Sequence, residues 1–195
     1  MSIHLKYLFF IYNYHNVIYF ILWIFLFGNN VYSLDIIIRN TEKDISSIPT
    51  ILHNIPLYKD GLTLYFPDPY YDFSPYDIWS VSITMEHSVS FISTSKNNTI
   101  FDHGKDSRMG FSFYFNDKEA IQLVYFKGII FTHYYGPRIN LITVNVINEL
   151  FHVVFEDCQF IDIISSVITT SLSDITCGLV SDDFRQVEFN NCKFM

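Results

Sequence analysis

Two stretches of the chain repeat one pattern: VVFEDCQFI, residues 153–161, and VEFNNCKFM, residues 187–195. Each copy has an apolar residue, a phenylalanine, two polar residues, a cysteine and a second phenylalanine at the same spacing. In the first copy Val153 and Phe155 are two residues apart and therefore share one face of a strand, as do Cys158 and Phe160. The repeat thus predicts two short strands in each copy.

The residues between these two strands must form a bend. The step from Phe155 to Cys158 is three residues, which would turn the second strand to the opposite face if the chain ran straight. The pair Val153 and Phe155 and the pair Cys158 and Phe160 face one side only if residues 156–157 (Glu-Asp) bend the chain. The second copy has Asn-Asn at the equivalent positions, 190–191. A looser copy has Lys-Gly at 127–128. Gly, Asn and Asp accept the positive φ angles of tight bends best.

The copies are 29 and 34 residues apart, which is too long for a simple hairpin meander. This spacing favours a coil of several short strands that returns and stacks on itself, a solenoid. Short β-branched and aromatic runs separated by turn residues predict an all-β chain, with one short helix at 41–52 and a loop in the proline-containing stretch 67–75. The predicted strands are 35–39, 62–66, 79–85, 89–93, 99–102, 110–115, 121–126, 129–133, 139–146, 152–155, 159–163, 178–181 and 186–189.

The pattern apolar-x-Phe-x-x-Cys-x-Phe, with Asn, Asp or Gly at the bend, resembles the repeat of right-handed parallel β-helix proteins. These form the pectin-lyase-like superfamily, and the closest resemblance is to the polymorphic-outer-membrane-protein-type repeats of secreted protist proteins. Residues 97–115 resemble a segment found near the start of such helices. The resemblance covers 89–195 and implies a short right-handed parallel β-helix there, open or truncated at its C-terminal end. Residues 34–88 would form the N-terminal cap and first rungs.

The N-terminus sets the expected compartment. Residues 17–27 form an uninterrupted apolar run of 11 residues, followed by Val31 and Ser33 at the spacing of a signal-peptidase site. We favour a signal peptide at 1–33 that is cleaved before Leu34. The alternative is an uncleaved signal-anchor helix over residues 7–27, which would include Asn and His residues within the membrane. The protein is thus expected to be secreted, or tethered to a membrane by a single span.

The charge excludes one class of partner. The 195 residues carry a net charge of −8, 50% are hydrophobic and 18% are aromatic. An acidic chain without a basic stripe repels phosphate backbones, so we expect no nucleic-acid binding.

Two features of the sequence predict covalent modification. Cys158 and Cys192 occupy equivalent repeat positions and would lie one above the other, at a spacing that permits a disulfide. The alternative, which we favour because Cys177 makes the count odd, is a stack of buried thiols. Asn97, in Asn-Asn-Thr, is an N-glycosylation acceptor in a polar turn.

Catalytic patterns are weak. Asp182 and Asp183 invite comparison with the paired aspartates of β-helix glycosidases, but the Gly-His-Gly and Arg-Ile-Lys motifs of those enzymes are absent and Arg185 stands alone. Asp174 is too far away to complete a Ca²⁺ cluster. The seven histidines show no metal-ligand spacing. We therefore predict no catalytic residue, cofactor or metal ion.

The aromatic stretch 65–79 allows two interpretations. It contains seven aromatic residues together with Asp68, Asp72 and Asp77. Such a stretch could stack on sugar rings, but we favour a role in covering the N-terminal end of the core.

The sequence thus favours a non-enzymatic β-helix with a structural or interaction role. Its expected partners are a carbohydrate, another protein, or a second copy bound through the open last rung. One alternative is a carbohydrate-active enzyme acting on an acidic polysaccharide. Another is a truncated, non-functional relative.

Overall fold

Residues after the N-terminal segment fold as a parallel β-solenoid. The computed structural model describes residues 34–75, 81–104, 110–116, 120–135, 140–147, 150–172 and 186–195. In these residues the strands form three parallel sheets, which we call A, B and C. Sheet A contains β1 (Leu34–Ile37), β2 (Leu62–Phe66), β5 (Val89–Ser93), β8 (Gln122–Lys127), β11 (Phe151–Glu156) and β14 (Val187–Asn190). Sheet B contains β3 (Tyr70–Asp72), β6 (Thr99–Asp102), β9 (Ile129–Tyr134), β12 (Gln159–Ile163) and β15 (Lys193–Phe194). Sheet C contains β4 (Val81–Met85), β7 (Phe111–Phe115), β10 (Ile142–Val146) and β13 (Ile168–Leu172).

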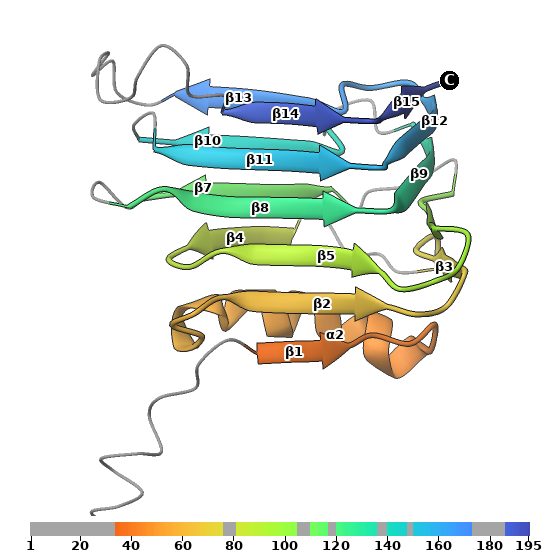
Figure 1. Cartoon of the computed structure of the whole chain (residues 1–195), viewed down its shortest axis with the longest axis horizontal. Helices are drawn as coiled ribbons and strands as arrows, with labels where there is room; N and C mark the ends of the chain where they lie inside the picture. The colour runs from red at the N-terminus through yellow and green to blue at the C-terminus, as the bar shows by residue number, and fades with distance from the viewer. Residues whose placement is uncertain are drawn as a thin grey trace, which may run out of the picture.

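The chain visits the sheets in the order A, B, C on every turn, so each strand pairs with its counterpart one turn earlier. About four turns are formed, from β2 to β13, and β14 and β15 begin the next. In Figure 1 the strands of sheet A run left to right in front, those of sheet C run back behind them, and the chain climbs from bottom to top. This is a right-handed coil, so the prediction of an all-β parallel solenoid is confirmed.

The interior is a set of vertical ladders. The two copies of the repeat stack directly: Val153 pairs with Val187, Phe155 with Phe189, and Phe160 with Phe194. The phenylalanine ladder of sheet A continues downward through Phe126 to Phe91. Its successive rings lie nearly parallel with centroids 4.7–5.2 Å apart. Such stacking follows from strand spacing, since equivalent side chains on neighbouring strands lie roughly 4.8 Å apart.

The bends between sheets A and B have the predicted conformation. Gly128, Asp157 and Asn191 have φ angles of 66°, 54° and 53°, and Asn98 has 68° at the corresponding place one turn before Gly128. A residue with positive φ reverses the direction in which the following side chains point. For this reason Cys158 and Phe160 face the same interior as Phe155.

A helix covers the N-terminal end of the core. Helix α2 (Glu42–His53) begins at Thr41, whose side chain accepts a hydrogen bond from Asp44 N at 3.2 Å, as an N-cap does. Its buried residues Ile45, Ile48 and Leu52 and the short helix η1 (Ile55–Leu57) lie beneath sheet C, next to β4. The predicted helix at 41–52 thus agrees with the structure to within a residue at each end.

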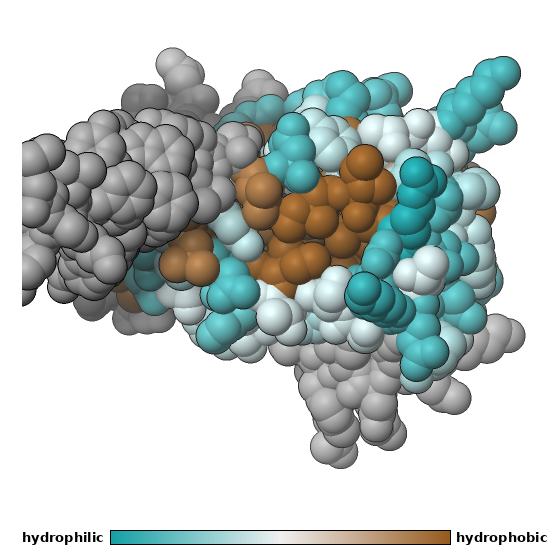
Figure 2. All heavy atoms as spheres, turned by 90° about the horizontal axis from the view of Figure 1, so that it is seen from below, coloured by the Kyte–Doolittle hydropathy of each residue, from teal (hydrophilic) through white to brown (hydrophobic). Residues whose placement is uncertain are grey.

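This end is not completely covered by polar residues. Figure 2 looks at it from below and shows an apolar area framed by hydrophilic side chains. Ile37 of β1 and Leu57 of η1 are exposed by 59% and 62%.

The sequence analysis missed two strands, and the strand predicted at 178–181 lies outside the described residues. The prolines of residues 67–75 indicated a loop, but Tyr70–Asp72 forms β3 and pairs with β6. The strand is tolerated because Pro67, Pro69 and Pro75 all lie outside it, so no ladder hydrogen bond is lost. Strand β13 was missed because its sequence, ITTSL, has a threonine, Thr170, at the position that Val144 occupies on β10, which interrupts the alternation of apolar residues.

Candidate functional site

The bend between sheets A and B gathers polar side chains into a column. Asn191 Nδ2 donates to Asp157 Oδ1 at 2.6 Å, and Asn98 Nδ2 donates to the backbone oxygen of Asp157 at 3.3 Å. Asn98 can reach a residue two turns away because Gly128, on the turn between Asn98 and Asp157, has no side chain. A Cβ atom on Gly128 would lie 3.5 Å from Asn98 Oδ1 and 3.3 Å from the Cβ of Ser93. We call Asn98, Gly128, Asp157 and Asn191 the bend column.

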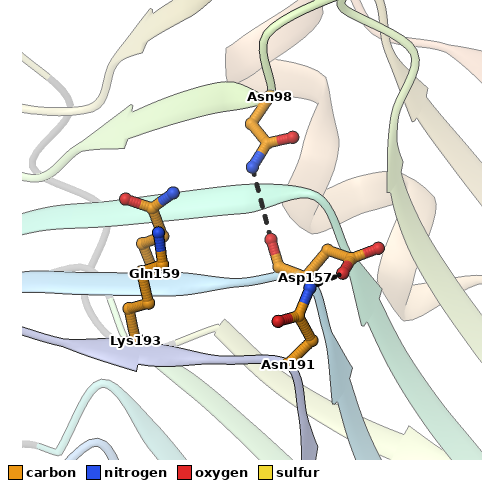
Figure 3. Close-up of a pocket in the computed structure, with 5 residues that line it drawn as sticks. All are labelled: Asn98, Asp157, Gln159, Asn191 and Lys193. Carbon is orange, nitrogen blue, oxygen red and sulfur yellow. Dashed lines mark hydrogen bonds between the residues drawn. The ribbon is translucent and has the colours of Figure 1, made fainter.

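A cavity lies beside the bend column. It is open to solvent, has a volume of about 320 Å³ and is lined by Asn98, Asp157, Gln159, Asn191 and Lys193. Gln159 and Lys193 are register partners on β12 and β15 and form a second column next to the first (Figure 3). The lining offers a carboxylate, three amides and an ammonium group, which together can donate to and accept from hydroxyl groups.

A second polar cluster lies on sheet B, and we call it the Asp102 cluster. Tyr70 OH donates to Asp102 Oδ2 at 3.0 Å, and Gly104 N donates to Asp102 Oδ1 at 2.9 Å. His133 Nδ1 lies 2.9 Å from the same Oδ1 atom, and His133 Nε2 lies 3.9 Å from Asp162 Oδ2. His133 and Asp162 each have a φ of 55°, so both depart from a regular strand at equivalent places on adjacent turns.

These contacts fix the protonation of the Asp102 carboxyl. Partial burial alone would favour its neutral form, but hydrogen bonds from Gly104 N, His133 and Tyr70 outweigh burial and lower the pKa of Asp102. Burial and the hydrogen bond to Asp102 raise the pKa of Tyr70 to about 12, so the phenol stays neutral. The pair of Asp102 and His133 holds an imidazole ring in a fixed orientation, which is an arrangement capable of proton transfer.

Within the part of the chain that the structure describes, no group of three or more His, Cys, Asp or Glu side chains is placed to hold a metal ion.

The predicted modification sites fall in ordered parts of the fold. Asn97 is exposed in the turn between β5 and β6. Cys158 is buried and Cys192 is partly buried, one turn apart, and both are free thiols. The remaining residues weighed from the sequence, Asp77, Asp174, Cys177, Asp182, Asp183 and Arg185, lie outside the described residues.

The aromatic stretch 65–79 supplies core residues where it is described. Tyr71 and Phe73 are buried, and Tyr71 OH donates to Ile38 O at 2.6 Å. Asp68 accepts from Asn40 N at 2.7 Å, and Asp72 Oδ1 accepts from Ser74 N at 2.9 Å. Asp68 therefore ties this stretch to the segment before α2, and Asp72 shapes a local turn. Of the described aromatic residues in the stretch only Tyr70, in the Asp102 cluster, is well exposed.

The Asp102 cluster was missed in the sequence, although a signal for it exists. Aligning the turns on the ladder of Phe101 and Phe131 places Asp102 beside Thr132. His133 then follows one residue later, within reach of Asp102. Aligning the two turns at Phe101 and Phe131 would therefore have identified Asp102 and His133 as neighbours.

The N-terminal predictions remain untested by the fold, since residues 7–27 precede the described region. Within that region no helix has the length and apolar character needed to cross a bilayer. Comparison of the chain with protein-family models, curated proteins and solved structures gives no match, so the parallel β-solenoid is the level at which the chain is classified.

Proposed function

We propose that the protein is a non-enzymatic interaction module, secreted or tethered to a membrane. It associates with a second copy of itself through strands β14 and β15, which we call the last rung. One observation carries the proposal: ladder positions that are buried on earlier turns are exposed on β14 and β15. Phe155 and Phe160 are exposed by 0% and 2%, whereas their stacking partners Phe189 and Phe194 are exposed by 37% and 58%.

An exposed rung of this kind favours strand pairing. The outer edge of β14 presents backbone donors and acceptors, and its inward side chains present apolar surface. Two copies meeting through the same rung would form a symmetric contact that closes on itself. At the opposite end α2 lies beneath sheet C and covers the edge of that sheet, although an apolar area with Ile37 and Leu57 stays exposed beside it. Because one of the three sheets is covered there, a contact between two last rungs is favoured over head-to-tail stacking of complete rungs.

Sedimentation analysis of the full chain over a range of concentrations tests this proposal. We expect a monomer–dimer equilibrium that Phe194→Asp shifts to monomer. The matched control is Tyr114→Asp on β7, because Tyr114 is also an exposed aromatic residue, at 39%, but lies away from the last rung. A monomeric wild-type protein at all concentrations, or equal effects of the two substitutions, would contradict self-association.

A second candidate is a carbohydrate-active enzyme, which the fixed pair of Asp102 and His133 favours. Incubation of the purified protein with acidic polysaccharides, followed by measurement of new reducing ends and of unsaturated products, tests this function. Activity that His133→Gln abolishes would support the enzyme and contradict the non-enzymatic proposal. Binding without turnover, weakened by Gln159→Ala or Lys193→Ala, would instead indicate a carbohydrate ligand in the cavity.

A further inference from the structure

Cys158 and Cys192 lie on adjacent turns at equivalent positions, each directly after a bend residue with positive φ. Lys193 N donates to Cys158 O at 3.0 Å, and the next residues, Gln159 and Lys193, pair in register. The two cysteines are therefore separated by one strand spacing, roughly 4.8 Å. Disulfide-bonded cysteines typically have Cα atoms about 4.4–6.8 Å apart, so the backbone needs no rearrangement to accommodate a bond.

The two side chains also point the same way. Cys158 is fully buried in the core, and Cys192 packs against that core. Cys158 Sγ lies 3.5 Å from Phe126 O, and Cys192 Sγ lies 3.4 Å from Phe155 O. Each thiol thus makes the same contact with the turn before it, which places both sulfur atoms in one vertical column.

In place of the stack of free thiols that the odd cysteine count favoured, we propose that Cys158 and Cys192 form a disulfide under oxidising conditions, which ties β14 and β15 to the preceding turn. The last turn packs against neighbours on one side only, as the exposure of Phe189 and Phe194 shows. A covalent link there restrains the least supported rung and limits the freedom of the unfolded chain.

The chemistry is thiol–disulfide exchange with a small disulfide such as oxidised glutathione. One cysteine thiolate attacks the oxidant and forms a mixed disulfide, releasing one reduced glutathione. The second cysteine thiolate then displaces the other glutathione, so two thiols and one oxidised glutathione give one protein disulfide and two reduced glutathiones.

Burial governs when this exchange can occur. Burial raises the pKa of Cys158 to about 12, and partial burial also raises the pKa of Cys192. Because the thiolate is the reactive form, a folded and reduced protein should oxidise slowly. The bond is therefore expected to form while the last turn is still docking, and added denaturant should accelerate it.

Refolding of the full chain in a glutathione buffer, followed by trapping of free thiols and peptide mass spectrometry, tests the proposal. We expect a cross-linked peptide pair containing Cys158 and Cys192 in wild type and in Cys177→Ser. Adding a reductant, which breaks the disulfide, should lower the midpoint of thermal unfolding by about 10 °C in both proteins. Cys192→Ser should show no such dependence on reductant.

Three outcomes would overturn the proposal: free thiols at both positions after refolding, a cross-link that contains Cys177, or equal midpoints with and without reductant. The comparison of oxidised and reduced wild type stands even if a serine variant fails to fold. The inference goes beyond the proposed function and is tested separately from it, since the refolding buffer sets the redox conditions and no dimer is required.

Discussion

Asp157 and Asn191 have φ angles of 54° and 53°, and this feature of single residues decides which side chains enter the core. Without the positive φ, Cys158 and the residues that alternate with it would point outward, and Phe155 would lose its contact with Phe160 in the core. The Asn and Asp residues at these positions tolerate positive φ through local hydrogen bonds. In addition, the Asn191 side chain donates a hydrogen bond to the Asp157 side chain one turn earlier. The bend column is thus first a structural device, and the cavity beside it is a consequence of that stacking.

Gly128 is the bend residue whose replacement should cost most. Gly128→Ala places a Cβ at a φ of 66° and 3.3 Å from the Cβ of Ser93. We expect the free energy of unfolding in urea to fall by about 1–2 kcal/mol. Asn191→Gly, which keeps the positive φ and removes only a side chain, should cost less. Equal stability of Gly128→Ala and wild type would contradict the assigned bend.

Asp102 should make stability depend on acidic pH. Its pKa is lowered in the folded state, so the unfolded chain binds the proton more tightly and stability falls as pH falls. The stabilisation that the ionised Asp102 carboxylate contributes is complete above the pKa of Asp102 in the unfolded chain. It is lost below about pH 4, as the pH falls through the pKa of Asp102 in the folded protein. Urea unfolding midpoints measured between neutral and acidic pH should show a steeper decline for wild type than for Asp102→Asn. Parallel declines would mean that Asp102 is not held as an ion.

The turn between β5 and β6 combines an exposed acceptor with a buried hydroxyl. Asn97 is exposed, but Thr99 Oγ1 donates to Asp68 O at 3.0 Å and lies 2.8 Å from Ser93 Oγ. The hydroxyl is thus enclosed once the turn has folded, so we expect a glycan on Asn97 to be attached before that.

Asn97→Gln should therefore abolish the glycan without affecting stability. The measurement is the gel mobility of protein from a secreting cell, before and after endoglycosidase treatment. Thr99→Ser should keep both the glycan and the fold, whereas Thr99→Ala should lose the glycan and also destabilise the protein. A mobility shift that survives Asn97→Gln would place the sugar elsewhere.

At the scale of elements, the sequence predicted those strands in which inward residues are large and alternate. The bends at 127–128, 156–157 and 190–191 were predicted because Gly, Asn and Asp have a known preference for positive φ. Strand β3 could not be predicted, since it is held by pairing with β6, a contact formed only in the folded coil. Strand β13 likewise pairs with β10, and its sequence lacks the alternation of large apolar residues that identified the other strands.

The polar sites were harder to predict than the strands. The partners Asp102 and His133 are 31 residues apart in the chain and meet only because their turns stack. The reach of Asn98 to Asp157, over two turns, likewise depends on the register of the coils. Local patterns carry no information about such contacts until the rungs are aligned.

At the scale of the whole molecule, the N-terminal segment should decide where the solenoid is delivered. We expect cleavage after Ser33, since residues 17–27 and the small residues that follow fit a secretory signal. Mass spectrometry of protein from the medium should find Leu34, the first residue of β1, as the new N-terminus. Intact Met1 in a membrane fraction that resists alkaline extraction would indicate an anchor instead.

The solenoid is held together by ladders that run through every turn, so one ladder residue tests the whole architecture. Phe155 is fully buried between Phe126 and Phe189, with ring centroids 5.2 and 4.8 Å away. Phe189 occupies the same ladder position one turn later, but it stacks on Phe155 on one side only and its other side is exposed. Gln159, which points to solvent beside the bend column, is a better surface control than Glu156. Glu156 is less suitable because it forms an ion pair with Lys127 at 2.7 Å and accepts a hydrogen bond from Tyr125 OH.

The most direct test is the free energy of unfolding of Phe155→Ala, Phe189→Ala and Gln159→Ala, measured by denaturant titration. Phe155→Ala should lose about 3–5 kcal/mol or fail to fold, because it removes a ring from the middle of a ladder. Phe189→Ala should lose clearly less, and Gln159→Ala should change stability by under about 0.5 kcal/mol. Equal losses at Phe155 and Gln159 would contradict the inward ladder, and with it the stacked repeat on which the fold depends.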